Sequence, residues 1–384
     1  MMIDKEYYFL LCKDAELNKE KYIELAKSQC VKWEYTGWKR YDTTPFWFER
    51  NLEPRSPIME SGAPFTYCFN EVGEICFIQS HQQECFERSD NRIINRRYSY
   101  GKVDSIEELI FINRMPVKYV EFIVRSGMNS GQEWHFEEEY AYDNKNKLTE
   151  IKRTEYWYAG KTVRNRLYQI HYDEYDNLSM IKEGGSIIYS YLSVEQVREI
   201  RNDVKRALLA ESIETIKKIG KLVENEIICF ISIYLHDEPH GPIDPMFQAG
   251  LESVRNEQLA SGENIYALWN AVEHAGPEET LSDTEVTEKF KLLMQYWQIH
   301  SDWSNEPNSA VLANKTWWGE SKVLWQEVSM ELNKLDWKAL IPVTEAFVIY
   351  IDEEALDVVN GDLALSVPND KLLFLESKGL ISLS

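Results

Sequence analysis

The spacing of apolar residues changes near residue 190, and this change constrains the fold more than any other feature of the sequence. Before it, short runs alternate apolar and polar residues, as in 118–143 (KYVEFIVRSGMNSGQEWHFEEEYAYD). Such alternation around a turn rich in Gly, Ser and Asn is typical of antiparallel hairpins with one solvated face. After it, apolar residues recur at helical spacing. Since 384 residues exceed one usual core, we expect an α+β protein of two domains: an antiparallel β-meander with one helix at 1–190, and an α/β domain at 193–384.

Individual elements follow from the same patterns. We interpret 5–12 as a strand and 15–28 as the helix of the first domain. Ser193 and Gln196 have the spacing of a capping box, which predicts the start of a helix that runs to about residue 222. The apolar run IICFISIYL (227–235) is typical of a central strand covered on both faces. Further helices are expected at 283–299, at 321–335 and after Pro368, and a further strand at 346–351.

The first domain also contains an internal repeat. The sequence YDNKNKLTEI, which begins at Tyr142, is followed 30 residues later by YDEYDNLSMI. The matching positions are Tyr142, Leu148 and Ile151, then Tyr172, Leu178 and Ile181, and in a degenerate third copy Phe69, Ile75 and Ile78. In each copy an aromatic residue ends one strand, Asp or Asn opens a tight turn through its side-chain oxygen, and an aliphatic residue begins the next strand. Each copy is therefore expected to be one hairpin, and the hairpins should share one sheet.

These hairpins resemble YD repeats, the tyrosine-aspartate hairpins of bacterial Rhs-type proteins. Their pattern is roughly YD, two residues, Gly, one residue and Leu. Asn146 and Asp176 stand where Gly is usual, and only Gly73 of the third copy matches. The alternative is an ordinary meander with the same turn chemistry.

The net charge is −22, from 42 Lys and Arg against 64 Asp and Glu. The residues before Leu192 hold 31 acids and 26 bases, whereas the rest hold 33 acids and 16 bases, so the acidity belongs to the second domain. Binding to nucleic acid or to anionic lipid depends on Lys and Arg, so neither nucleic acid nor a membrane is an expected partner. A basic protein is an expected partner, because complementary electrostatic fields raise the rate at which two proteins encounter each other. The alternative is that the acidity serves solubility alone.

Six cysteines form no CxxC pair, and we expect them to be reduced, mostly buried thiols. The first residues, MMIDKEYYFLLCKDAE, place an acid before a short apolar run and include no small-residue cleavage site, unlike a signal peptide. No apolar run approaches the ~18 residues that cross a bilayer. These observations favour the cytoplasm.

No hydrolase elbow, P-loop or dinucleotide fingerprint occurs, so we assign no catalytic residue, no cofactor and no metal, and expect a protein that is not an enzyme. The alternative is a metal-dependent hydrolase that uses His236 and His240, in the loop HDEPH after the apolar strand. Imidazole and carboxylate ligands suit zinc or manganese. Against it, Pro239 prevents a helical presentation of the two imidazoles.

The second domain resembles a bacterial α/β family found among the immunity proteins of polymorphic toxin systems. The resemblance lies in the order of a leading helix, the strand IICFISIYL, the segment ENIYALWNAVE and the closing segments TEAFVIYIDEE and SVPNDKLLFLESKGLI. It implies a cytoplasmic protein that neutralises a basic toxin, such as a nuclease, by binding it. A scaffolding protein that binds through the β-meander is a further alternative.

The candidate contact residues are acids of the second domain and tryptophans of its polar segment SDWSNEPNSAVLANKTWWGE. Tryptophan is enriched among binding hot spots, although these indoles could instead pin the segment to the core. The candidates are Asp237, Glu238, Glu278, Glu279, Asp283, Trp303, Trp317, Trp318, Asp352, Glu353 and Glu354.

Overall fold

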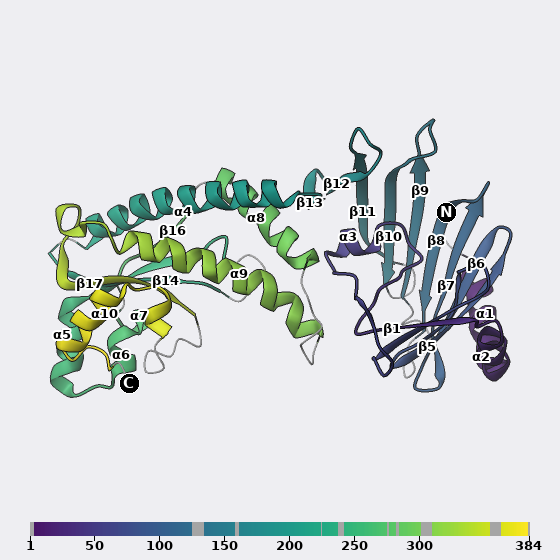
Figure 1. Cartoon of the computed structure of the whole chain (residues 1–384), viewed down its shortest axis with the longest axis horizontal. Helices are drawn as coiled ribbons and strands as arrows, with labels where there is room; N and C mark the ends of the chain where they lie inside the picture. Colours follow the sequence, from purple (N-terminus) through teal and green to yellow (C-terminus); the bar gives the residue numbers. More distant parts are fainter. Residues whose placement is uncertain are drawn as a thin grey trace. The chain divides into compact units, whose positions relative to one another are not determined.

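The computed structural model divides the chain into two compact units. Unit 1 is formed mainly by Met1–Tyr191, and unit 2 by Leu192–Gln298 together with Ala310–Ser384. The expected mixed α+β class, with a long antiparallel meander followed by helices and a second sheet, is confirmed (Figure 1). The residues described are 4–124, 134–157, 161–223, 225–236, 242–274, 276–281, 284–300, 309–353 and 362–382.

Within these residues, unit 1 forms a 13-stranded antiparallel sheet. From β3 to β13 each strand pairs with its neighbour in sequence, which defines a meander, and β1 and β2 extend the sheet beyond β3. The strands are β1 (Lys32–Thr36), β2 (Ile58–Met59), β3 (Phe65–Phe69), β4 (Ile75–Gln79), β5 (Gln82–Ser89), β6 (Arg92–Ser99), β7 (Lys102–Ile112), β8 (Met115–Ile123), β9 (Trp134–Tyr142), β10 (Leu148–Trp157), β11 (Lys161–Tyr172), β12 (Leu178–Glu183) and β13 (Ser186–Ser190).

Helices cover both faces of this sheet. Helices α1 (Lys5–Leu17) and α2 (Lys19–Ser28) pack across β4, β5 and β7, where the hydroxyl of Tyr8 donates a 2.7 Å hydrogen bond to Glu108. Successive residues of a strand point to opposite faces. Glu107 therefore lies on the other face, which we call the inner face of unit 1; it also carries Glu138, the partner of Arg50 in helix α3 (Trp47–Asn51).

The interpretation of 5–12 as a strand is wrong, and unit 1 has more than the one expected helix. Tyr8, Cys12 and Ala15 are all buried, and their spacing of four and three residues places them on one side of a helix. The side chain of Asp4 accepts a hydrogen bond from the backbone N–H of Tyr7 and caps the helix. Short apolar runs do not distinguish a strand from a buried helical face.

The three repeat copies are hairpins with the same turn chemistry, and they share one sheet. Asp143, Asp173 and Asn70 each accept hydrogen bonds from the backbone N–H groups two and four residues later, at 2.8–3.2 Å. The third residue after each has a positive φ: Asn146 at 63°, Asp176 at 68° and Gly73 at 82°. Asn and Asp tolerate this left-handed conformation better than other residues with side chains, which explains how two copies dispense with Gly.

A chain of ion pairs crosses the inner face of unit 1. The Arg50 guanidinium makes a bidentate contact with the fully buried Glu138, which Arg153 also contacts at 3.0 Å. The chain continues from Arg153 to Glu155 at 3.1 Å and from Glu155 to Arg166 at 3.5 Å. Arg97 likewise contacts Glu107 and Glu121. The acids described on this face therefore lie close to guanidinium groups.

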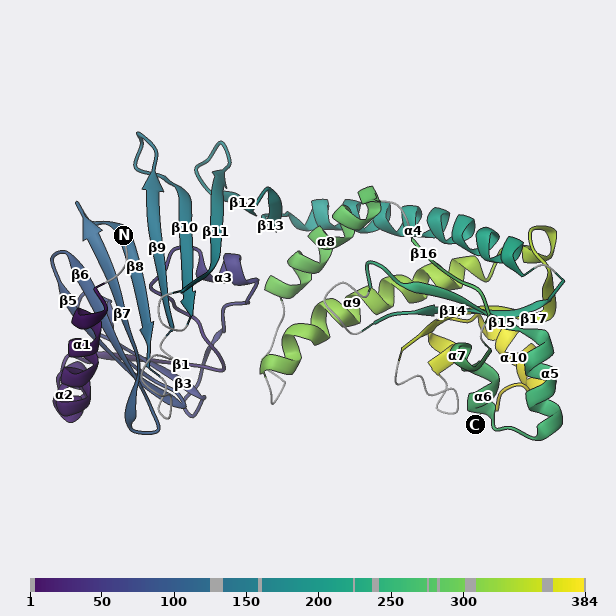
Figure 2. The same cartoon turned by 180° about the vertical axis from the view of Figure 1, so that it is seen from behind.

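Unit 2 is a layered α/β unit. Its four-stranded sheet, within the described residues, has the order β16-β15-β14-β17, with β14 parallel to β17 and the other pairs antiparallel. Helices α4, α8 and α9 pack on one face, and α5, α6, α7 and α10 on the other (Figures 1 and 2). The bounds are α4 (Val194–Leu222), β14 (Ile228–Tyr234), β15 (Met246–Leu251), α5 (Glu252–Ser261), α6 (Ile265–Trp269), α7 (Ala271–His274), β16 (Glu278–Thr280), α8 (Thr284–Ile299), α9 (Ser309–Leu332), η1 (Trp337–Ala339), β17 (Val343–Asp352), η2 (Asp362–Leu365) and α10 (Asn369–Ser377).

Several elements of unit 2 match their prediction. The capping box is formed. The side chain of Ser193 accepts a hydrogen bond from the backbone N–H of Gln196, and the side chain of Gln196 accepts one from the backbone N–H of Ser193. Strand β14 is buried on both faces. Helix α9 begins before the predicted residue 321, whereas strands β15 and β16 were not predicted. None of the helices in the described ranges combines the length and the apolar character needed to span a bilayer.

The buried ion pair gives a stability prediction. In Arg50→Met, Glu138 stays buried without its bidentate partner, so the free energy of unfolding should fall by about 3 kcal/mol. The matched control is Arg206→Met, because Arg206 is 79% exposed and pairs with the exposed Asp203; it should change stability by less than about 0.5 kcal/mol. Urea unfolding followed by far-UV circular dichroism measures both. Equal effects would show that the Arg50–Glu138 pair does not hold α3 on the sheet.

The repeat turns give a pH prediction. Backbone N–H donors lower the pKa of Asp143 and of Asp173, so their charge stabilises the fold above pH ~4 and is lost as the pH falls through the folded value. The double variant Asp143→Asn, Asp173→Asn keeps the acceptor oxygens without the charge. It should have a lower urea midpoint than the parent at pH 7, and the difference should shrink as the pH falls below ~4. A difference that stays the same below pH ~4 would refute this origin.

Candidate functional site

The candidate site lies in unit 2, where the parallel strands β14 and β17 end side by side. Tyr234, the last residue of β14, pairs with Asp352, the last residue of β17. The carboxyl ends of parallel strands are common ligand sites in α/β folds. A cavity of about 360 Å³ opens here, which we call the strand-end cavity. It is lined by Ser232, Tyr234, Met246, Gln248, Tyr266, Trp269, Asn270, Ala271, Val272, Asp352 and Glu353.

Asp352 is the partly buried acid of this cavity. The hydroxyl of Ser232 donates a 3.0 Å hydrogen bond to its Oδ2, and the backbone N–H of Glu353 also donates to the carboxylate. No cation pairs with Asp352 in the described part of the chain, and burial raises its pKa to about 6. The neighbouring Glu353 is already engaged, because Lys322 contacts it at 2.6 Å. The cavity thus contains one buried carboxylate whose charge is uncompensated.

Gln248 faces the same cavity from β15. It pairs with Ser232 across the two strands, so both side chains lie on one face of the sheet. Its side chain is 7% exposed, and within the described residues its amide has no hydrogen-bond partner. Sequence reasoning missed both residues. Ser232 could have been noticed as a polar residue inside the apolar run 227–235, whereas Gln248 lies on an unpredicted strand.

Four of the predicted acids can be placed. Asp352 and Glu353 line the cavity. Glu278 is exposed and Glu279 is partly exposed on the edge strand β16, where Glu278 pairs with Gln248. Four further predicted acids lie outside the described residues: Asp237, Glu238, Asp283 and Glu354.

The tryptophans do not form the expected exposed anchor. Trp317 is 4% exposed and belongs to the core of unit 2, and the half-buried Trp318 packs against that core with its ring edge-on to Trp317. Trp317 therefore has no free surface for a partner, and its role as an anchor is corrected to core packing. Trp303 lies outside the described residues.

The histidine pair can be assessed only in part. His236 is exposed just after β14, with its ring edge-on to that of Tyr234 at 4.6 Å, and His240 lies outside the described residues. In the described ranges the group whose ligand atoms lie close enough to hold a metal is instead Cys30, Cys68 and Cys76 in unit 1.

The cysteine group does not fit a metal ion. Cys30 and Cys68 are joined by a disulfide, so the expectation of six reduced thiols is wrong for these two residues. The Sγ atom of Cys76 lies 3.3 Å from that of Cys68. Because the disulfide uses two of the three sulfur atoms, one thiol remains, which is too few ligands for zinc. Cys30 and Cys68 are 38 residues apart in the sequence, and this spacing does not predict a disulfide, because the fold brings the two residues together.

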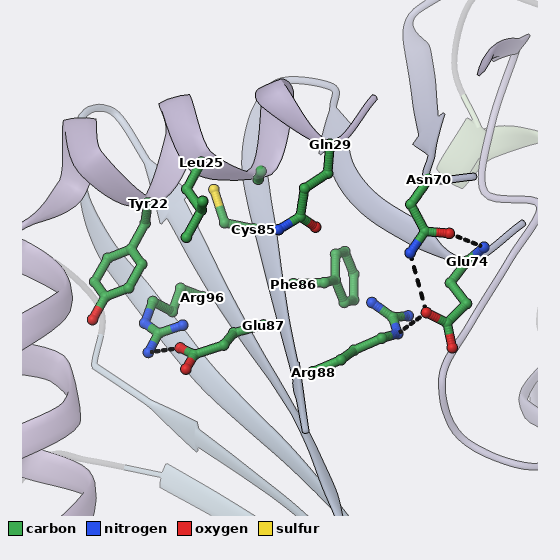
Figure 3. Close-up of a pocket in the computed structure, with 11 residues that line it drawn as sticks. Tyr22, Leu25, Gln29, Asn70, Glu74, Cys85, Phe86, Glu87, Arg88 and Arg96 are labelled. Atoms are coloured by element: carbon green, nitrogen blue, oxygen red, sulfur yellow. Dashed lines mark hydrogen bonds and ion pairs between the residues drawn. The ribbon is translucent and has the colours of Figure 1, made fainter. Parts of the chain in front are cut away.

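Cavities of unit 1 contain charges that pair with one another. In a cavity of about 150 Å³ between α2 and the sheet (Figure 3), Arg96 contacts Glu87 at 2.7 Å and Arg88 contacts Glu74 at 3.5 Å. A cavity of about 330 Å³ on the inner face is lined by the ion-pair chain described above. These cavities therefore contrast with the strand-end cavity, whose carboxylate lacks a cation.

Charge is also distributed unevenly over unit 2. Helix α4 carries seven Lys and Arg against five Asp and Glu, whereas residues 222–288 hold fourteen Asp and Glu and a single Arg. That residue, Arg255, is 2% exposed and pairs with Glu252. Of the described acids of this stretch that are exposed, Glu226 precedes β14, and Glu285 and Glu288 lie in α8 on the α4 side of the sheet. The others, which we call the acidic surface, lie in or beside β15, α5, α7 and β16. They are Asp244, Glu257, Glu263, Glu273 and Glu278.

No protein-family model matches the chain, and none of the curated proteins is similar to it at a significant level.

The buried acid gives the prediction for this site. Since the folded state raises the pKa of Asp352 to about 6, it holds the proton more tightly than the unfolded chain, and the free energy of unfolding falls as the pH rises from about 4 to 6. Asp352→Asn mimics the protonated form. It should match the parent at pH 4 and be more stable by about 2 kcal/mol at pH 7. Chemical denaturation at the two pH values measures this. Glu278→Gln, an exposed acid, is the control, and a parent more stable than Asp352→Asn at pH 7 would contradict the assignment.

Proposed function

We propose that the protein is an immunity-type binding protein that neutralises a basic protein toxin, such as a nuclease, in the cytoplasm. Unit 2 binds the toxin through its acidic surface and covers the toxin's own site, so inhibition needs no catalysis. The observation that carries the proposal is the charge of residues 222–288, where fourteen acids accompany one buried, paired arginine. A requirement for solubility alone gives no reason for α4 to be slightly basic while the opposite layer is acidic.

The arrangement of the helices supports one binding face. Helices α5, α6 and α7 lie on the side of the sheet away from α4 and α9 in both views (Figures 1 and 2). Their acids therefore add to one field on that side, and such a field accelerates encounter with a basic protein. In unit 1, the 31 acids before Leu192 are nearly balanced by 26 bases, so this unit offers no comparable field and supports the scaffolding alternative less well.

The proposal predicts where charge matters for association with the toxin encoded beside this protein. Replacing Glu257, Glu263, Glu273 and Glu278 together by Gln should slow association about tenfold at low salt, and salt should slow association of the parent more than that of the variant. The control replaces four exposed acids of unit 1 by Gln: Glu16, Glu24, Glu71 and Glu174. Surface plasmon resonance at several salt concentrations measures the rates.

The control makes the result decisive because both variants remove four negative charges. If the two variants slow association equally, net charge acts without a specific face, and the proposal is wrong. A larger effect of the unit 1 variant would support the scaffolding alternative. Absence of binding by the parent protein would refute the immunity role.

A further inference from the structure

The strand-end cavity has the chemistry of a receptor for one cationic group. Its charged lining residues are Asp352 and Glu353, both acids, and Glu353 is already paired with Lys322. Its volume of about 360 Å³ lies at the lower end of the ~300–1,000 Å³ of typical ligand sites. A single side chain or a small molecule is therefore the appropriate size of ligand.

We propose that this cavity receives an arginine side chain of the basic partner. The guanidinium group lies between the carboxylate of Asp352 and the side-chain amide of Gln248. This inference rests on the proposed function and names the contact that it requires.

The side-chain oxygens of Asp352 and Gln248 can both accept further hydrogen bonds, so the cavity favours a ligand with several N–H donors. Asp352 accepts hydrogen bonds from Ser232 and from a backbone N–H, and the carboxylate has acceptor capacity beyond these two. Gln248, a residue that is 7% exposed, lines the cavity, and its carbonyl oxygen accepts no hydrogen bond within the described residues. A guanidinium group has five N–H donors in a planar fork that can reach both acceptors.

The walls favour a planar cation over a compact one. Tyr234, Tyr266 and Trp269 line the cavity, and aromatic faces attract cations, arginine more often than lysine. Burial raises the pKa of Asp352, which indicates that its negative charge is poorly stabilised without a ligand. A site that is strained when empty is stabilised when a cation enters, which is a reason for a protein to retain a buried carboxylate.

The test uses the full chain and N-acetylarginine amide, with N-acetylcitrulline amide as its neutral counterpart of the same shape. Isothermal titration should give at least tenfold tighter binding of the arginine compound to the parent protein. Asp352→Asn should abolish this preference, and Glu174→Gln, which removes an exposed acid of unit 1, should keep it. Equal binding of both compounds, or a preference that persists in Asp352→Asn, would overturn the proposal. Because Asp352→Asn is expected to be the more stable protein at pH 7, misfolding does not confuse the result.

A second experiment, on dissociation of the toxin, distinguishes failure of this inference from failure of the proposed function. Dissociation of the toxin from Asp352→Asn should be at least tenfold faster than from the parent, and unchanged for Glu174→Gln in unit 1. If the toxin binds both equally, the arginine receptor is refuted and the immunity role stands. If no toxin binds, but the arginine compound binds through Asp352, the cavity is a cation site and the immunity role is refuted.

Discussion

A charged side chain that leaves water loses solvation energy, and this loss must be offset by an opposite charge or by hydrogen bonds. The two units satisfy this constraint differently. In unit 1, Glu138 is buried but lies between Arg50 and Arg153. In unit 2, Asp352 is partly buried, and within the described residues its carboxylate is held by the hydroxyl of Ser232 and a backbone N–H. The first arrangement is complete within the chain, whereas the second is completed by a ligand that brings a positive charge.

The surface of unit 2 extends the same contrast. The acids of the acidic surface lie in the layer of β15, α5, α7 and β16, and the one arginine of residues 222–288 is paired internally. The strand-end cavity is formed beside this layer, because Gln248 belongs to the strand that pairs with Glu278. Long-range attraction would bring a basic protein to this side, and the cavity would fix one of its side chains. The acidic surface would therefore set the rate of association, and the strand-end cavity would set the specificity of binding.

Local patterns were sufficient to predict the elements whose chemistry is local. The capping box at Ser193, the buried strand β14 and the repeat turns at Asp143 and Asp173 depend on residues a few positions apart. The helix α1 was missed because its caps and buried face were not weighed against the apolar run. The Cys30–Cys68 disulfide and the cavity were missed because each joins distant segments. Ser232 and Asp352 lie 120 residues apart, so only the parallel pairing of β14 and β17 reveals their contact.

Hydrogen–deuterium exchange of the protein with and without its toxin tests the central claim most directly. The account predicts that the toxin slows exchange in 244–280 and around residue 352, in the layer that carries the acidic surface and in the cavity beside it. Exchange in the meander of unit 1 and in α4 should stay unchanged. Protection confined to unit 1 or to α4 would contradict the account, because the partner would then meet a surface where acids and bases are balanced.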